Sequence, residues 1–120
     1  MKARIASWVR VDALRVRAEA GGAHVMIERK GDPTAGAIFV KALKAGGFGD
    51  PRQARLFEPF IGEDGAASWR ARFESRWRGE TDIDEILSRQ ANFDQDLWIV
   101  TVEDRCGHHF LDDVLEDGGI

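Results

Sequence analysis

The spacing of apolar and polar residues predicts two helices. From Trp8 to Ala20 apolar side chains recur every three or four positions, Ser7 before them can cap the helix, and Gly21-Gly22 after them ends it. A second stripe of the same period begins at Ile83, directly behind Thr81-Asp82, whose side chains suit a helix start. We therefore expect helices over 8–20 and from 81 to 91.

Five stretches have the alternating or continuous apolar character of strands, and turns containing glycine or proline separate the first four. They are His24–Arg29, Ala37–Leu43, Arg55–Ile61, Ser68 to at least Phe73, and Asp96–Glu103. The loop between the first two is short enough for a hairpin. Because Pro59 cannot donate to a sheet ladder, the third stretch is expected at an edge or with a bulge.

The fifth stretch predicts the centre of the sheet. Leu97 to Val100 is uninterruptedly apolar, so we expect Ile99 and Val100 in a strand buried on both faces. Links of hairpin length between the first four stretches leave no room for the crossovers of a parallel sheet. The expected fold is α+β, in the order helix, four strands, helix, strand, as a single domain over residues 1–120. Its sheet would be mainly antiparallel, with about five strands and two helices packed on one face.

The run from Ser68 to Arg78 is compatible with two structures. In an extended chain the aromatic side chains would share one face and the arginines the other. The aromatic residues are also four apart, as on one side of a helix. We expect a strand at least through Phe73, because the turn before the run continues a meander, and both structures stay open beyond it.

Charge is divided unevenly along the chain. Residues 1–78 contain fifteen of the seventeen Lys and Arg but only nine of the twenty-one Asp and Glu, whereas the remainder contains two and twelve. Such asymmetry can attract an anionic partner to one surface. It can equally be internal, with the acidic end of the chain lying over the basic part.

Arginine outnumbers lysine thirteen to four, which favours bidentate recognition of carboxylate or phosphate. The candidate anion- or partner-binding residues are Arg70, Arg72, Arg76, Arg78, Trp69 and Trp77. With no catalytic motif in the chain, we expect a non-enzymatic interaction or regulatory module that uses this arginine-bearing face. Binding of nucleic acid or another anion is an alternative, and a solvated face would produce the same pattern.

The tryptophans indicate self-association. Trp8 and Trp98 lie in apolar stripes and are expected in the core, whereas Trp69 and Trp77 flank arginines and suit a symmetric interface. A homodimer would bring the basic face of one subunit to the acidic second helix of the other. A monomer with all four tryptophans in its core is the alternative.

One cluster of metal-capable side chains offers a different class of function. Cys106, His108 and His109 suit zinc and could centre a small metal-dependent hydrolase. Structural zinc sites normally bring paired ligands from two separated segments, and a polar loop after a strand explains the same residues. The Gly46–Gly49 loop lacks the phosphate-loop and dinucleotide patterns, so no cofactor is expected.

Composition places the chain in the cytoplasm. Cys106 is the only cysteine, which excludes an intramolecular disulfide, and 43% hydrophobic with 32% charged residues is typical of a globular protein. No apolar run approaches the length needed to cross a bilayer, so neither export nor a membrane partner is expected.

Several groups of residues resemble a family of small uncharacterised bacterial proteins, a domain of unknown function. They are Trp8-Val9, Gly31-Asp32-Pro33 with Ala35-Gly36-Ala37, Asp64-Gly65 with Trp69, and Asp94 to Val100 with Glu103. The resemblance covers nearly the whole chain. It implies a one-domain protein and brings neither an assigned activity nor a catalytic residue.

Overall fold

The protein is described by a computed structural model over residues 5–46, 48–112 and 114–115. The helices are α1 (Ser7–Ala20) and α2 (Glu80–Phe93), with a short 3-10 turn, η1 (Phe73–Ser75). The strands are β1 (His24–Arg29), β2 (Ile38–Lys44), β3 (Gln53–Ile61), β4 (Ala67–Ala71), β5 (Arg78–Gly79), β6 (Trp98–Asp104) and β7 (Val114–Leu115). The apolar pattern predicted both helices and the five longer strands, whereas β5 and β7 span two residues each and leave no periodic signal.

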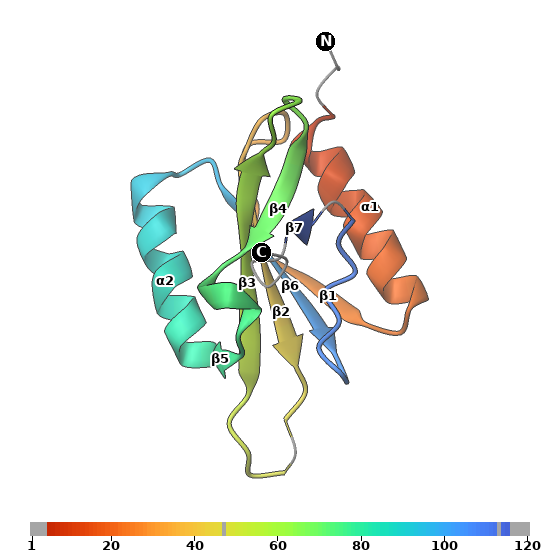
Figure 1. Ribbon diagram of the computed structural model, residues 1–120, viewed down its shortest axis with the longest axis vertical. Coiled ribbons are helices and arrows are strands. Elements are labelled where there is room, and N and C mark those ends of the chain that lie inside the picture. Colours follow the sequence, from red (N-terminus) through yellow and green to blue (C-terminus); the bar gives the residue numbers. More distant parts are fainter. Residues whose placement is uncertain (1–4, 47, 113, 116–120) are drawn as a thin grey trace.

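The sheet is mixed, and β6 is inserted between the first two strands. The strand order is β1-β6-β2-β3-β4-β7, with β5 paired to β3 (Figure 1). β6 runs antiparallel to β1 and parallel to β2. The predicted hairpin of the first two strands is therefore wrong. The predicted α+β sheet is confirmed in part: four of the six strand pairings are antiparallel, but β2–β6 and β4–β7 are parallel and the described sheet has seven strands instead of five. A strand as apolar as β6 would expose the most apolar surface if it lay at an edge of the sheet. Its position between β1 and β2 gives it a neighbouring strand on both sides.

The central position of β6 confirms what its sequence predicted. Val100 is fully buried, and Ile99 is half-buried against the core under α2. The strand therefore has neighbours on both sides and side chains packed on both faces, although the cover over Ile99 is incomplete.

The two helices lie on opposite faces of the sheet, not on one face as the sequence suggested (Figure 1). Alternate residues of β2 face each helix. Ile38, Val40 and Ala42 pack with Val11, Leu14 and Ala18 of α1. Phe39 and Leu43 pack with Ile83 and Leu87 of α2. Because β2 is buried along both faces, one layer of helix could not have covered it.

The start of α1 is fixed by the loop before β2. Ser7 is not the cap; it is the first helical residue, and its Oγ donates to the carbonyl of Gly36 at 2.6 Å. The backbone N–H groups of Ser7 and Trp8 donate to the carbonyls of Thr34 and Pro33 at 3.1 and 2.9 Å. These hydrogen bonds satisfy backbone N–H groups at the start of α1 that have no side-chain cap. Trp8 is 55% exposed, so its expected place in the core is wrong.

The start of α2 also differs from its prediction. Its N-cap is Gly79, without a side-chain hydrogen bond, so Thr81 and Asp82 do not cap the helix. Glu80 and Asp82 do lie in the first turn, where their charges are favourable to the helix dipole.

Pro59 lies in an interior strand of regular register, so the predicted edge or bulge is wrong. Proline is tolerated because the pairing of β3 with β2 has ended there: the last β3 residue paired with β2 is Phe57, opposite Val40. Continuing this register would put Pro59 opposite Ile38. The indole Nε1 of Trp69 donates to the Ile38 carbonyl at 3.0 Å and supplies the N–H that proline lacks.

Candidate functional site

Alternation along β4 separates its arginines from its core residues. Trp69 and Ala71 point into the core under α1, and Arg70 points to the opposite face, where its register partner on β3 is Glu58. Nε and Nη2 of Arg70 donate to Oε1 of Glu58 at 3.3 and 3.1 Å. Nη1 of Arg72 donates to the other oxygen, Oε2, at 3.3 Å. One carboxylate therefore lies between two guanidinium groups.

A left-handed turn after β4 adds a third guanidinium. Phe73, Glu74 and Ser75 have φ of 56, 56 and 63°, so the strand expected through Phe73 ends at Ala71 and neither strand nor α-helix continues. The turn places the Phe73 ring between two cations, with Cζ of Arg72 at 5.0 Å and Cζ of Arg78 at 4.3 Å from its centroid. Both distances are typical of cation–π contacts.

We call this surface the guanidinium face and define it as Arg70, Arg72 and Arg78 with Glu58, Phe60 and Phe73. Phe60 also carries a cation, since Cζ of Arg70 lies 5.0 Å from its centroid. The side chains of Arg70 and Arg72 are 43% and 31% exposed, and Arg78 is exposed. Three positive charges and one negative charge leave the face cationic and within reach of solvent.

The other predicted residues of this run lie elsewhere. Arg76 is exposed and pairs with Glu74 at 3.1 Å. Trp69 is 3% exposed, so its expected place at an interface is wrong. Trp77 is half-buried, and its ring packs so closely on Gly107 that a Cβ there would collide with it. The sequence therefore grouped six residues, of which the structure brings three together on the guanidinium face.

The Cys106–His109 segment is a loop held by Asp104. The Asp104 carboxylate accepts the backbone N–H groups of Cys106 and His108 at 2.9 and 3.1 Å. Burial alone would raise the pKa of Asp104, but these hydrogen bonds and the nearby His108 lower it below its ordinary value. His109 turns inward instead: its Nδ1 accepts the N–H of Leu111, and its ring packs edge-on against Phe57.

The predicted metal ligands are thus used separately. Cys106 is exposed, and Nδ1 of His108 lies 3.1 Å from Asp104. Over the described residues, no group of three or more His, Cys, Asp or Glu side chains is arranged to hold a metal ion.

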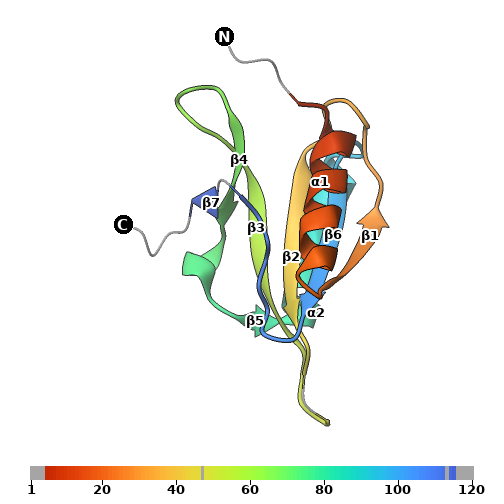
Figure 2. The ribbon, with the colours of Figure 1, turned by 90° about the vertical axis from the view of Figure 1, so that its right-hand side faces the viewer.

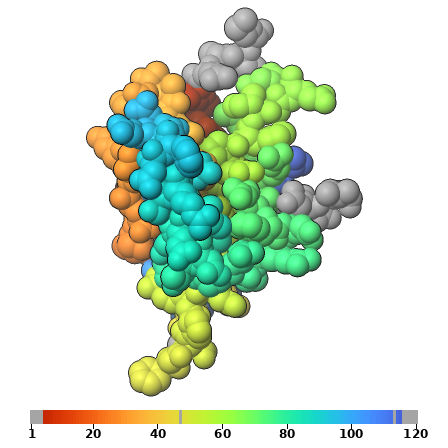
Figure 3. Space-filling model, turned by 90° about the vertical axis from the view of Figure 1, so that its left-hand side faces the viewer, coloured from red at the N-terminus to blue at the C-terminus, as the bar shows by residue number. Residues whose placement is uncertain are grey.

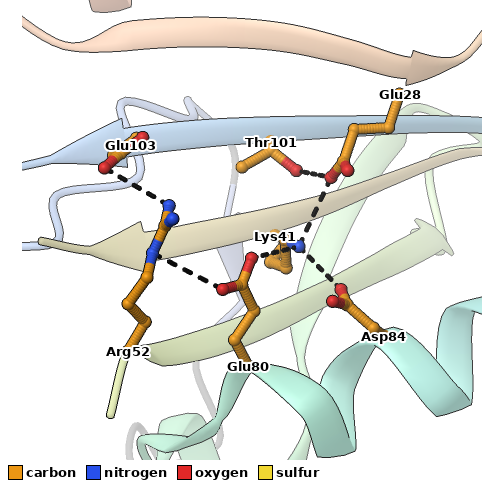
Figure 4. A network of polar contacts seen from close by, with 7 residues as sticks. All are labelled: Glu28, Lys41, Arg52, Glu80, Asp84, Thr101 and Glu103. Carbon is orange, nitrogen blue, oxygen red and sulfur yellow. Dashed lines mark hydrogen bonds and ion pairs between the residues drawn. The ribbon is translucent and has the colours of Figure 1, made fainter. Parts of the chain in front are cut away.

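A buried lysine is the most unusual ionic feature of the fold, and it is not among the residues predicted from the sequence. Lys41, at the centre of β2, is 1% exposed. Its ammonium lies 2.9 Å from Glu80, 2.6 Å from Asp84 and 3.3 Å from Glu28 (Figure 4). Two signals could have revealed it: Lys41 interrupts the apolar run of β2, and Glu80 and Asp84 are one helical turn apart.

The ion pairs around Lys41 connect the basic part of the chain, residues 1–78, with its acidic remainder. Arg52 bridges Glu80 and Glu103 at 3.5 and 3.3 Å, and Thr101 donates to Glu28. Burial alone would lower the pKa of Lys41, but hydrogen bonds to Asp84 and Glu80 and the charge of Glu28 outweigh it and raise the pKa. Lys41 is therefore a charged ammonium at neutral pH, which makes it a poor nucleophile and an effective tie between the sheet and α2.

Fold and surface together define a small α+β protein with a mixed sheet between two helices. The chain belongs to the DUF1491 family, described as a protein of unknown function, whose sequence profile matches residues 5–112. This confirms the resemblance drawn from the motif residues.

Solved structures of the family are similar over almost the full chain. A DUF1491 protein from Caulobacter crescentus, solved by crystallography, is 40% identical with a TM-score of 0.79, covering 92% of this chain and 99% of that one. An NMR structure of a DUF1491 protein from the same organism is 38% identical with a TM-score of 0.79, covering 96% and 100%. A protein from A. tumefaciens is 26% identical with a TM-score of 0.76, covering 96% and 98%.

No curated protein matches the chain, and the family description assigns no activity. Among the described residues, neither helix has the length and apolar content needed to cross a membrane.

Proposed function

We propose that this chain is a single-domain, non-enzymatic interaction module whose guanidinium face binds an acidic segment of a partner protein. One observation supports this most directly: Glu58 is held between Arg70 and Arg72, while Arg78 stacks on Phe73 with no ion pair among the described residues. The face already binds one carboxylate and has a further cation beside it. Arginine on an aromatic ring presents its N–H groups in a fixed orientation, which suits bidentate carboxylate recognition.

A short acidic peptide fits the surroundings of this face better than a nucleic acid does. The helix α2 begins two residues after Arg78 and carries Asp82 and Glu85 exposed to solvent. A nucleic-acid backbone carries charge along its whole length and would meet these carboxylates. A peptide with a few acidic residues can remain within the face.

Binding of a labelled hexaglutamate peptide tests the proposal. We expect Arg78→Gln to weaken binding about tenfold, since a charge-assisted hydrogen bond contributes about 1.5 kcal/mol. Arg76→Gln is the matched control. Arg76 carries the same charge and is only two residues from Arg78, but its side chain lies outside the guanidinium face. Fluorescence anisotropy at low and at physiological salt measures both.

Three results would contradict this function: no peptide binding at low salt, equal losses for the two variants, or tighter binding of a single- or double-stranded oligonucleotide than of the peptide. The last result would favour the nucleic-acid alternative.

Self-association stays a prediction, to be checked by sedimentation at several concentrations, and so does the cytoplasmic location. The burial of Trp69 removes one reason for a dimer.

A further inference from the structure

Glu58 is the one negative charge of the guanidinium face, and it occupies two of the three arginines. Arg70 lies opposite Glu58 in the register of β3 and β4 and donates to its Oε1 through Nε and Nη2. Arg72 donates to Oε2 through Nη1. Both oxygens of the carboxylate are therefore bonded to arginine. An incoming carboxylate meets Arg70 with one edge of its guanidinium, the edge suited to bidentate pairing, already in use.

The two arginines are also held by contacts that do not involve Glu58. Cζ of Arg70 lies 5.0 Å from the ring centroid of Phe60, and Cζ of Arg72 lies 5.0 Å from that of Phe73. The Phe73 ring itself packs against the core cluster under α2. These cation–π contacts should keep both guanidinium groups in place when the charge of Glu58 is removed.

The guanidinium face is open to solvent beside α2. Figure 2 shows β4 and the turn after it on the other side of β3 from α1. In Figure 3, which looks onto α2, the green surface of this segment lies next to the helix and is not covered by it. A ligand can therefore approach the arginines directly. What limits access to their N–H groups is the carboxylate of Glu58.

Arg78 differs from the other two arginines of the face. It is exposed, its Cζ lies 4.3 Å from the Phe73 centroid, and it forms no ion pair with any of the described residues. The first carboxylate of a ligand can bind here without displacing an internal partner. A further carboxylate has to compete with Glu58 for Arg70 and Arg72.

We propose that Glu58 is an internal competitor that limits the affinity of the guanidinium face for acidic ligands. In the wild type an acidic segment binds through Arg78, while Glu58 retains Arg70 and Arg72. Without the charge of Glu58 all three arginines bind the ligand. This inference rests on the function proposed above and names the residue that sets the strength of binding. A repulsive group within a binding site is a common way to reject unsuitable ligands.

Removing the charge of Glu58 tests the competition. We expect Glu58→Gln to bind the labelled hexaglutamate peptide about tenfold more tightly than the wild type, since the peptide gains a charge-assisted hydrogen bond. Glutamine keeps the length of the side chain and an oxygen that can accept from Arg70. Glu63→Gln is the matched control, because it removes the same charge from the exposed turn between β3 and β4. It should change the affinity by less than about twofold, since charges outside the site are screened by salt.

A second substitution separates competition from a general effect of charge. Arg70→Gln should weaken peptide binding less than about threefold in the wild type, where Glu58 holds Arg70, but about tenfold in the Glu58→Gln background. A long-range effect of charge alone would make the two losses equal. Equal losses would therefore overturn the proposal.

NMR of the arginine side chains tests the competition in the wild type alone. Saturating hexaglutamate should shift the Nε–H signal of Arg78 and leave that of Arg70 unchanged, because the Nε–H of Arg70 donates to Glu58. Shifts of equal size would show that the peptide reaches Arg70 past Glu58. That result would overturn the proposal even if Glu58→Gln failed to fold.

The outcomes distinguish this inference from the function on which it rests. If the wild type binds the peptide through Arg78 but Glu58→Gln binds no more tightly than Glu63→Gln, Glu58 has only a structural role and the proposed function stands. If Glu58→Gln binds at low salt and the wild type does not, the competition is complete and the proposed function fails for the wild type. Absence of binding by both proteins overturns both proposals.

Discussion

Several residues that carry the family resemblance have architectural roles. The Asp32 carboxylate accepts the N–H groups of Thr34 and Ala35, and its carbonyl accepts the indole N–H of Trp98 at 2.8 Å. Gly31 and Gly36 lie against the backbone at Asp96, where a Cβ would collide. These residues join the loop before β2 to the start of β6. Their pattern therefore identifies the fold without identifying a ligand.

Among the charged side chains, Lys41 is the one whose removal should lower the stability of the fold most through lost ion pairs. We expect Lys41→Met to lower the free energy of unfolding by about 2 kcal/mol, less than for a fully buried pair because Glu28 and Asp84 still reach water. Lys44→Met, on the same strand but exposed, should change it by less than about 0.5 kcal/mol. Urea unfolding of both variants decides this, and equal stabilities would contradict it.

The Lys41 contribution should also depend on pH. Because folding raises the pKa of this ammonium above its ordinary value of 10.5, the stabilisation is complete below that pH and is lost as pH rises through the folded pKa. The difference in stability between the wild type and Lys41→Met should therefore be constant near neutrality and shrink in strong alkali. A difference that grows with pH would contradict the ion-pair assignment.

At the scale of elements, the connection from β4 to β5 is strained. Three consecutive non-glycine residues have positive φ, and Glu74 at its centre is exposed. A left-handed residue with a Cβ costs about 1 kcal/mol relative to glycine. We expect Glu74→Gly to be more stable than Glu74→Ala by about this amount, since both variants lose the surface pair with Arg76. Urea unfolding measures the difference, and an Ala variant at least as stable would show that the turn is relaxed.

At the scale of the whole molecule, the uneven charge distribution is used internally. The acidic residues Glu80, Asp84 and Glu103 of the C-terminal part pair with Lys41 and Arg52 of the N-terminal part. The charge complementarity that the sequence suggested between two subunits of a dimer is thus partly satisfied within one chain. What remains on the surface is the smaller cationic guanidinium face.

The topology makes β6, close to the C-terminal end of the chain, necessary for the rest of the sheet. β1 reaches β2 only through β6, which comes after residue 93 in the chain. We therefore expect a fragment ending at Phe93 to show no cooperative urea transition, whereas the chain of residues 1–120 should show one. Circular dichroism follows both, and a cooperative transition in the shorter fragment would show that β1 and β2 can pair without β6.

The candidate site was only partly predictable. The alternation of β4 indicated that Arg70 and Arg72 share a face, because side-chain direction in a strand follows from the backbone alone. The contribution of Phe73 depended on a left-handed turn, and Trp69 was misplaced because its ring bonds across to Ile38. Lys41 was overlooked because its partners come from three separate elements.

The sequence by itself determined the two helices, the five longer strands and the burial of Val100, since each depends on local periodicity or on a continuous apolar run. Only the tertiary structure decided that β6 separates β1 from β2, that the helices cover opposite faces, and that Lys41 is neutralised by distant carboxylates. These features depend on contacts between residues far apart in the chain, and local patterns carry no information about which distant segment satisfies a strand edge or a buried charge.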